Sequence, residues 1–291
     1  NSKWKINRYF TKMTKKSKWK KRLFITISSF LGIIIILAII FNQLVYALLI
    51  AVGYQDVYYG NNERGNKIMS YALSKIKKPH ENTYHAISVQ NTKNGNYNIA
   101  IPALEKAYKI NPKEVGAYYG WVLLYYYHDY EKSLKILNTY DDSTPKFSDY
   151  PVGECIHYLK GLAYKQLKNY EEAIREFDES INNDLKNHGE NWIDYQVFLN
   201  KGISLYYLGK HQEAILEFER TLKNYDKCSE AFYYIGLCKL ALNFKDSACQ
   251  NLKKANELIS QGYKSSDTYV ELFHEIYKQQ IDEVILENCI N

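Results

Sequence analysis

Histidine and cysteine are the residue types in this sequence with the widest possible chemistry, as metal ligands, acid–base groups or nucleophiles. Two Glu-x-x-His pairs occur among seven scattered histidines, Glu154 with His157 and Glu271 with His274. On a helix this spacing puts both side chains on one face, as in the helices of di-iron bundles. Such bundles need further carboxylates from facing helices, and no other segment supplies them at matching spacing. We therefore expect no metal site.

The five cysteines are also dispersed, and no two of them have the two-residue spacing typical of a zinc-binding pair. Cys238 and Cys249 are expected on facing helices of one hairpin and could approach each other, so their pairing is left open. An odd number of cysteines argues against an oxidising compartment, although a buried cysteine also serves as a small apolar residue. The sequence has no glycine-rich phosphate loop, nucleophile elbow or zinc-binding helix motif. We expect no enzymatic activity, no catalytic residue, no cofactor and no small-molecule substrate.

A recurring pattern indicates the elements that would position these side chains. The stretch GLAYKQLKNYEEAIREF, which begins at Gly161, returns in outline at Gly202 and again at Gly236. In each copy the glycine is followed by Leu after six residues, Ala after twelve and Phe or Leu after sixteen. Small residues at two of these positions allow two antiparallel helices to approach closely, and the large residue fills the space beside them. The pattern therefore predicts stacked helix hairpins.

The pattern resembles the tetratricopeptide repeat (TPR), a helix–turn–helix unit of 34 residues. An earlier copy ends in Pro112, at a position where proline stops the second helix. The second copy is irregular because Val122 occupies a small-residue position, and its register is open by one residue. Two insertions rich in turn formers, residues 141–153 and 184–194, lengthen the spacing between copies. The five repeats begin near residues 81, 115, 154, 195 and 229.

The N-terminal residues differ from the rest of the chain in charge and apolarity. Residues 1–22 hold ten Lys or Arg and no acid, which leaves 28 basic against 32 acidic residues in the remainder. Residues 23–41 are 19 uncharged, mostly apolar residues. As a helix they would be ~28 Å long, close to the ~30 Å hydrocarbon thickness of a bilayer. A cleaved signal peptide is the alternative, but the apolar run is too long and lacks a good cleavage site.

The charge pattern also predicts an orientation for this membrane span. Lys and Arg next to a span are retained in the cytoplasm, and the flank that follows the span is neutral. We expect a single-pass membrane protein with its N-terminus in the cytoplasm and its TPR domain outside the cytoplasm. The basic arm then serves as a topology signal that attracts anionic lipid headgroups, and no nucleic acid partner is expected.

The predicted fold class is all-α, a right-handed α-solenoid of TPR helix hairpins preceded by a single transmembrane helix. The sequence Thr268-Tyr-Val-Glu271 reads as a capping box that opens a last helix with one apolar and one polar face. The expected parts are a basic arm at 1–22, a transmembrane helix at 23–47, a degenerate TPR-like hairpin at 48–80, five TPR repeats at 81–264 and a C-terminal capping helix at 265–291.

The resemblance implies that the first helix of each repeat lines a concave groove through repeat positions 2, 5, 9, 12 and 13. Tyrosine suits such a groove because it gives a large contact area and a polar tip at low entropic cost. The chain has 29 tyrosines, so packing between repeats is the alternative role for each of them. Apolar residues at position 9 argue against a clamp for acidic C-terminal tails. The predicted groove tyrosines are Tyr119, Tyr126, Tyr127, Tyr158, Tyr206, Tyr207 and Tyr233.

These features predict a membrane-anchored TPR scaffold that binds a partner protein or peptide segment in its groove, in cell-envelope assembly or secretion. The anchor would raise the effective concentration of partners bound to the same membrane. A cytosol-facing membrane receptor that recruits soluble proteins is one alternative. A toxin-neutralising immunity protein is another, and the sequence does not identify the partner.

Overall fold

The computed structural model describes residues 2–144 and 149–289, and their side chains at 25–144, 149–190 and 192–289. Across these residues there are thirteen α-helices and one short 3-10 helix, and no β-strand. The predicted all-α fold class is therefore confirmed. The chain divides into two compact units, Asn1–Ala100 and Ile101–Asn291.

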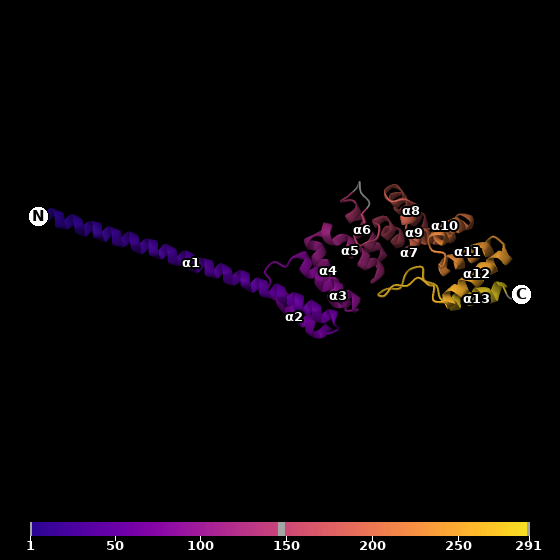
Figure 1. Ribbon diagram of the computed structural model, residues 1–291, viewed down its shortest axis with the longest axis horizontal. Helices are drawn as coiled ribbons and strands as arrows, with labels where there is room; N and C mark the ends of the chain where they lie inside the picture. The colour runs from indigo at the N-terminus through magenta and orange to yellow at the C-terminus, as the bar shows by residue number, and fades with distance from the viewer. Residues whose placement is uncertain (1, 145–148, 290–291) are drawn as a thin grey trace. The chain divides into compact units, whose positions relative to one another are not determined.

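The first unit is dominated by a single helix. Helix α1 runs without interruption from Ser2 to Tyr58 (Figure 1). Its segment Ile25–Tyr58 is long and apolar enough to cross a membrane, and the large apolar side chains between Ile25 and Val52 are mostly exposed. An apolar surface on every side of a helix is typical of a helix surrounded by lipid. This part of α1 is a candidate membrane anchor.

The C-terminal end of α1 pairs closely with α2 (Asn62–Lys75). A Cβ atom on Gly53 would lie 2.5 Å from Cγ of Met69, so the two helices touch where only glycine fits. Beside this contact, Nε of Arg64 donates to Oδ2 of Asp56 at 2.7 Å. Helix α3 (Glu81–Lys93) joins the pair through the amide of Gln90, which donates to the Tyr54 hydroxyl at 3.0 Å.

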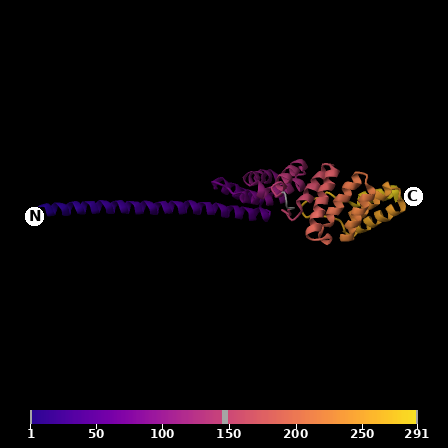
Figure 2. The ribbon, with the colours of Figure 1, turned by 90° about the horizontal axis from the view of Figure 1, so that it is seen from above.

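The second unit is a stack of helix hairpins that follow one another in chain order (Figures 1 and 2). From α5 onwards each α-helix packs against the next, and the first helices of successive hairpins also contact one another. Helix α4 (Tyr97–Ile110) begins before the boundary between the units and continues beyond it. The other helices of the stack are α5 (Pro112–Tyr125), α6 (Tyr130–Asp141), α7 (Ile156–Gln166), α8 (Tyr170–Asn187), η1 (Glu190–Trp192), α9 (Tyr195–Tyr207), α10 (His211–Asn224), α11 (Ser229–Ala241) and α12 (Lys245–Ser260).

Glycine sets the closest approach within each hairpin. A Cβ atom on Gly161 would lie 2.6 Å from Cε1 of Phe177, and the same conflict recurs between Gly202 and Phe218 and between Gly236 and Leu252. In the α5–α6 hairpin the equivalent glycine is Gly120, whose Cβ would lie 2.5 Å from Cδ2 of Leu137. The small-residue position of the irregular second repeat is therefore Gly120 rather than Val122. The register predicted for this repeat is wrong by two residues, and the turn after α5 contains one extra residue.

The C-terminal residues depart from the predicted helix. Helix α13 spans only Lys278–Cys289, and residues 261–277 form an irregular segment, which we call the strap. The helix predicted to open at Thr268 does not form, because side chains hold turns there instead. Asp267 accepts from the backbone N–H groups of Tyr269 and Val270, at 2.7 and 3.2 Å. Figure 1 shows the strap as a yellow loop that leaves α12 and reaches back towards α7 before returning to α13.

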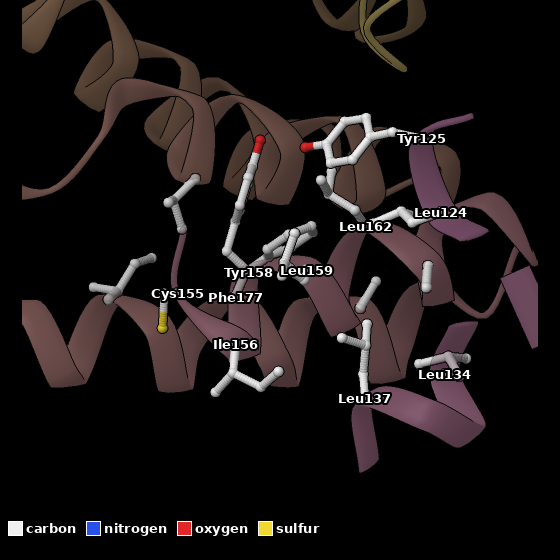
Figure 3. Packing of buried hydrophobic residues seen from close by; sticks show 14 of the residues in the cluster. Leu124, Tyr125, Leu134, Leu137, Cys155, Ile156, Tyr158, Leu159, Leu162 and Phe177 are labelled. Atoms are coloured by element: carbon white, nitrogen blue, oxygen red, sulfur yellow. The ribbon is translucent and has the colours of Figure 1, made fainter. Parts of the chain in front are cut away.

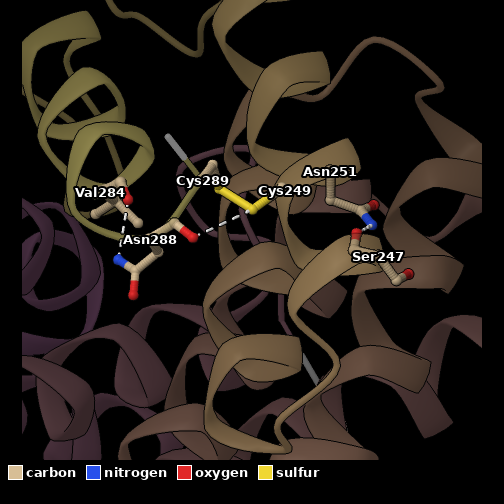
Figure 4. The surroundings of a disulfide bond; sticks show 6 residues. All are labelled: Ser247, Cys249, Asn251, Val284, Asn288 and Cys289. Atoms are coloured by element: carbon tan, nitrogen blue, oxygen red, sulfur yellow. Dashed lines mark hydrogen bonds between the residues drawn. A yellow bond between two sulfur atoms is a disulfide. The ribbon is translucent and has the colours of Figure 1, made fainter. Parts of the chain in front are cut away.

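A disulfide joins the last helix to the hairpin before it. Cys249 of α12 is bonded to Cys289 of α13 (Figure 4). Cys238 is a buried free thiol, so the pairing considered between Cys238 and Cys249 does not occur. Sequence proximity suggests the wrong pair, because α13 returns along α12 after the strap.

Candidate functional site

The candidate site is the surface of the second unit formed by the first helices of its hairpins, which we call the inner face. With Gly120 as the reference, α5 contributes Trp121 and Tyr125 to it. Figure 3 shows Tyr125 and Tyr158 projecting to one side of the packed layer, and Ile156 and Leu137 to the other. The main residues of the inner face are Trp121, Tyr125, Tyr158, Lys165, Gln196, Asn200, Tyr206, Tyr207 and Tyr233.

Three of the predicted groove tyrosines lie elsewhere on or near α5. Tyr119 is only 2% exposed, its hydroxyl donates to Oε1 of Glu105 at 3.2 Å, and the Lys132 ammonium lies 5.3 Å from its ring centroid. It therefore sits in the core between α4 and α6 and offers no surface to a partner, which corrects its assignment. Tyr126 and Tyr127 are half-buried where α5 ends.

A buried polar network joins α7 and α9 at the centre of the inner face. The Tyr158 hydroxyl donates to Oε1 of Gln196 at 3.2 Å and accepts from Nδ2 of Asn200 at 3.3 Å. Oδ1 of Asn200 accepts in turn from the Lys165 ammonium. Because Lys165 is buried and has no carboxylate partner in this network, burial lowers the pKa of its ammonium to about 7. The network is positioned to bind a carbonyl oxygen.

The strap supplies that carbonyl. The Phe273 backbone oxygen lies 3.5 Å from Nζ of Lys165, which donates to it. The Phe273 ring stacks on Tyr125 with centroids 5.3 Å apart, and it is nearly perpendicular to the Tyr130 ring, with centroids 6.0 Å apart. Val270, Leu272 and Phe273 all pack against the hydrophobic cluster that includes Tyr125 and Tyr158. The strap therefore covers the part of the inner face formed by α5 and α7.

His274 follows Phe273 and is 3% exposed. Its Nε2 atom makes no hydrogen bond within the described residues. Burial, together with the nearby positive charge of Lys165, lowers the pKa of His274 to about 3. The imidazole is therefore neutral at physiological pH, and the ionisable group beside it is the Lys165 amine rather than a carboxylate.

The two Glu-x-x-His pairs do not act as ligand sets in this structure. The Glu271 carboxylate accepts a hydrogen bond from the Tyr277 hydroxyl, while His274 lies beside Lys165. In the other pair, Nδ1 of His157 lies 2.8 Å from Oε2 of Glu176, a residue outside the pair. Each histidine is thus matched with a group other than the glutamate three residues before it.

Both ends of the strap are also attached to the repeats. The backbone N–H of Ser265 donates to Oε1 of Glu230 at 2.8 Å, where α11 begins. Lys264 and Glu275 form an ion pair at 2.9 Å that joins the outgoing and returning parts of the strap. Near its end, Ile276 packs in a cluster with Tyr233. The strap thus makes contacts along α5, α7 and α11.

A second part of the inner face is more open to solvent, above all at Tyr207. Tyr207 is 55% exposed and stacks on Tyr170 with centroids 5.1 Å apart. Tyr206 meets the Tyr207 ring at 5.3 Å and the Tyr234 ring at 5.6 Å. Tyr233 lies beside Tyr234, with ring centroids 5.3 Å apart. We call the five residues Tyr170, Tyr206, Tyr207, Tyr233 and Tyr234 the tyrosine cluster. The structure therefore brings together three of the predicted groove residues, Tyr206, Tyr207 and Tyr233.

Comparison with known families accounts for the stacked hairpins. Family models described as tetratricopeptide repeat match residues 82–114 and 154–227. The chain contains tetratricopeptide repeats. No curated protein gives a significant match to the sequence.

Solved TPR structures resemble this one in fold. A structure of PilF from Pseudomonas aeruginosa aligns with a TM-score of 0.54 at 18% identity, covering 75% of this chain and 94% of that one. Two MamA structures align with TM-scores of 0.50 and 0.51 at 20% and 19% identity; each covers 62% of this chain, and 98% and 92% of their own. At these identities the likeness shows the fold alone. A TPR fold typically serves protein interaction, which supports the predicted scaffold at that level.

Residues of the two insertions between TPR repeats line a cavity of about 410 Å³. Glu154 also lines it and accepts from the Tyr125 hydroxyl at 3.3 Å. Burial, and then the negative charges of Asp194 and Asp267, raise the pKa of Glu154 to about 7. Among the described residues, no group of three His, Cys, Asp or Glu side chains is arranged to hold a metal ion.

Two features of the TPR repeats were not predicted from the sequence. Lys160 and Lys201, each one residue before the crossing glycine, bridge neighbouring hairpins through ion pairs. Tyr119 occupies the same position before Gly120, which explains why it faces the preceding hairpin. Aligning Gly120 with the other glycines would have revealed this, whereas nothing in the sequence separates the apolar residues of the strap from a helical stripe.

Proposed function

We propose that this protein is a membrane-anchored TPR scaffold whose inner face binds an extended segment of a partner protein, in cell-envelope assembly or secretion. The observation that carries the proposal is the strap itself. It is a stretch of irregular polypeptide held on the inner face by ring stacking on Tyr125 and by a hydrogen bond from Lys165. A surface that binds one such segment has the chemistry to bind another.

The exposed apolar surface of α1 supports the membrane part of the proposal. Its large side chains between Ile25 and Val52 are mostly exposed, and exposing apolar area to water costs about 25 cal/mol per Å². Insertion of this segment into a bilayer removes that cost. The basic arm before it favours a cytoplasmic N-terminus.

The disulfide supports an extracytoplasmic TPR domain. Disulfides persist in oxidising compartments and are rare in the cytosol. The remaining three thiols, Cys155, Cys228 and Cys238, are buried, so they are protected from unwanted oxidation there. The odd number of cysteines is therefore compatible with this location.

Sidedness is tested with single introduced cysteines, because the native Cys228 is fully buried. Leu216→Cys on α10 replaces a side chain that is 61% exposed, and Ser17→Cys lies in the basic arm. A membrane-impermeant maleimide added to intact cells should label the first and reach the second only after permeabilisation. The reverse pattern would contradict the proposal and favour the cytosol-facing receptor.

Partner binding is tested by photocrosslinking in cells. A photoreactive phenylalanine at Tyr207 should capture partner proteins through the tyrosine cluster. The matched control is the same residue at Leu216, which is similarly accessible but lies on the second helix of that hairpin. Equal capture from both positions would refute binding at the inner face.

A further inference from the structure

We propose that the strap is an internal ligand, which a partner replaces by inserting an extended segment with an aromatic residue where Phe273 now lies. This inference rests on the proposed function and names the partner chemistry and the regulation of the same site. The covered part of the inner face is then a binding site in its closed state. The tyrosine cluster is the part that stays open.

The position of Phe273 defines an aromatic slot. Tyr125 lies face to face with its ring at 5.3 Å, and Tyr130 and His128 meet it edge-on at 6.0 and 5.9 Å. Three rings from the end of α5 and the start of α6 thus surround one side chain. A planar aromatic side chain satisfies this arrangement, as the Phe273 ring does.

The polar contacts define the backbone of the ligand. The Lys165 ammonium donates to the Phe273 carbonyl, and every peptide can present a carbonyl at this place. The residue after the aromatic one should not be a cation, because it is buried beside Lys165 as His274 is. The groups around this position are Lys165 on α7 and the buried amide of Asn200 on α9.

Few backbone hydrogen bonds hold the strap on the repeats. Beyond the turn that ends α12, backbone bonds to the repeats form where Ser265 donates to Glu230 and where Phe273 accepts from Lys165. Side chains add a bond from Lys227 to the Tyr263 hydroxyl at 2.8 Å and a contact of 3.4 Å between the Tyr195 and Ser265 hydroxyls. Other bonds of its backbone are local, such as Leu272 N–H to Glu275 at 2.8 Å. Segments held by few contacts open before the core does. Helix α13 and its disulfide keep the released strap near the site.

The occupant to which we commit is a segment of a different protein. The contacts that define the slot are ring stacking and a carbonyl hydrogen bond, which do not require a second copy of this chain. The tyrosine cluster contacts the strap at Tyr233. A partner can therefore bind to the cluster first and then replace the strap. Exchange of straps between two copies of this chain is the competing outcome.

The test measures binding of a fluorescent synthetic peptide, residues 264–277 of this sequence, to the full chain in detergent. Phe273→Ala empties the slot and should raise the peptide affinity at least tenfold over the unaltered protein, since less of the site is closed. Tyr269→Ala is the matched control, because this strap ring is 56% exposed and its removal should leave the affinity unchanged. Trypsin cleavage after Lys264 reports release of the strap in the same samples.

Two further measurements complete the test. Adding Lys165→Met to Phe273→Ala should abolish the increase in peptide affinity. A peptide with alanine in place of its phenylalanine should also show no increase. An unchanged affinity in Phe273→Ala, or an equal gain in Tyr269→Ala, would overturn the proposal. So would concentration-dependent dimers, which indicate strap exchange. If partner proteins crosslink to Tyr207 but Phe273→Ala does not change the peptide affinity, then only the strap inference is wrong. If Phe273→Ala raises the peptide affinity but no partner protein crosslinks to Tyr207, then only the proposed scaffold function is wrong.

Discussion

Tyr125 and Tyr207 occupy equivalent positions, each five residues after the glycine at its helix crossing, Gly120 or Gly202. The first is buried under Phe273 and the second is 55% exposed. The residue type and the repeat position are the same. The difference comes from a segment far along the chain from Tyr125, which covers one ring and leaves the other free.

A repeat position therefore defines an orientation but not a role. Tyr125 acts as core because the strap completes its surroundings, and its hydroxyl finds an acceptor in Glu154. Tyr207 remains a surface residue that stacks on its neighbours. The covered and open parts of the inner face should respond differently to substitution.

The largest expected effect is on the covered part, through the disulfide that holds α13 beyond the strap. The bond between Cys249 and Cys289 closes a 40-residue separation, and loop-closure entropy gives it ~4 kcal/mol of stabilisation. Reductant should lower the free energy of unfolding by this order in a urea titration. Cys249→Ser is the control and should not respond to reductant. Identical curves for the unaltered protein with and without reductant would contradict the prediction.

Removing the covered ring should have the next largest effect. Tyr125→Ala loses the stack on Phe273 and the donor to Glu154, and should lower the free energy of unfolding by ~3 kcal/mol. Tyr125→Phe keeps the ring and loses only the hydrogen bond, for ~1 kcal/mol. Urea titration of both variants separates the two contributions. If Tyr125→Ala has no effect, then the strap does not stabilise this part of the molecule.

Acidification should weaken the covered part through His274. Its pKa is lowered from 6.5 to about 3, so the unfolded chain takes up the proton first as pH falls through 6.5. Stability is lost from there down to about pH 3, at ~1.4 kcal/mol per pH unit. Between about pH 7.5 and about pH 5 the loss is ~2 kcal/mol relative to His274→Asn.

The comparison with His274→Asn isolates the histidine from its neighbours. Because the pKa of Glu154 is raised in the folded protein, this group increases the free energy of unfolding as pH falls from about 7 to 4.5. The lowered pKa of Lys165 makes the free energy of unfolding depend on pH only above about pH 7. Both groups are present in both proteins, so the difference between their urea titrations reports His274. Parallel pH profiles would show that His274 is not buried in solution.

The hairpins could be predicted well from the sequence because their pattern is local. Gly161 and Phe177 lie sixteen residues apart, within one hairpin, and three copies repeat the relation. The second repeat is placed wrongly by two residues, and one extra turn residue also shifts Leu137 relative to Gly120. A local irregularity of this kind is visible only when the contact itself is known.

The covered site could not be predicted, since it depends on contacts between distant residues. Phe273 and Lys165 are separated by 108 positions, and no periodic pattern relates them. The apolar residues of the strap have helical spacing, so burial against α5 and α7 looks in the sequence like the stripe of a capping helix. The open tyrosines could be placed together from the sequence, because this needs only the repeat register, which is regular from Gly161 onwards.

The smallest effect on stability is expected at the open ring. Tyr207→Ala should change the free energy of unfolding by no more than ~0.5 kcal/mol, because the ring is half in solvent and leaves no cavity. The same variant should lose most capture of partner proteins, measured with a photoreactive group placed at Tyr206. Tyr170→Ala removes the ring that stacks on Tyr207 and should reduce capture less. A loss of stability as large as that of Tyr125→Ala would mean that Tyr207 is part of the core, and the contrast between the two equivalent tyrosines would then disappear.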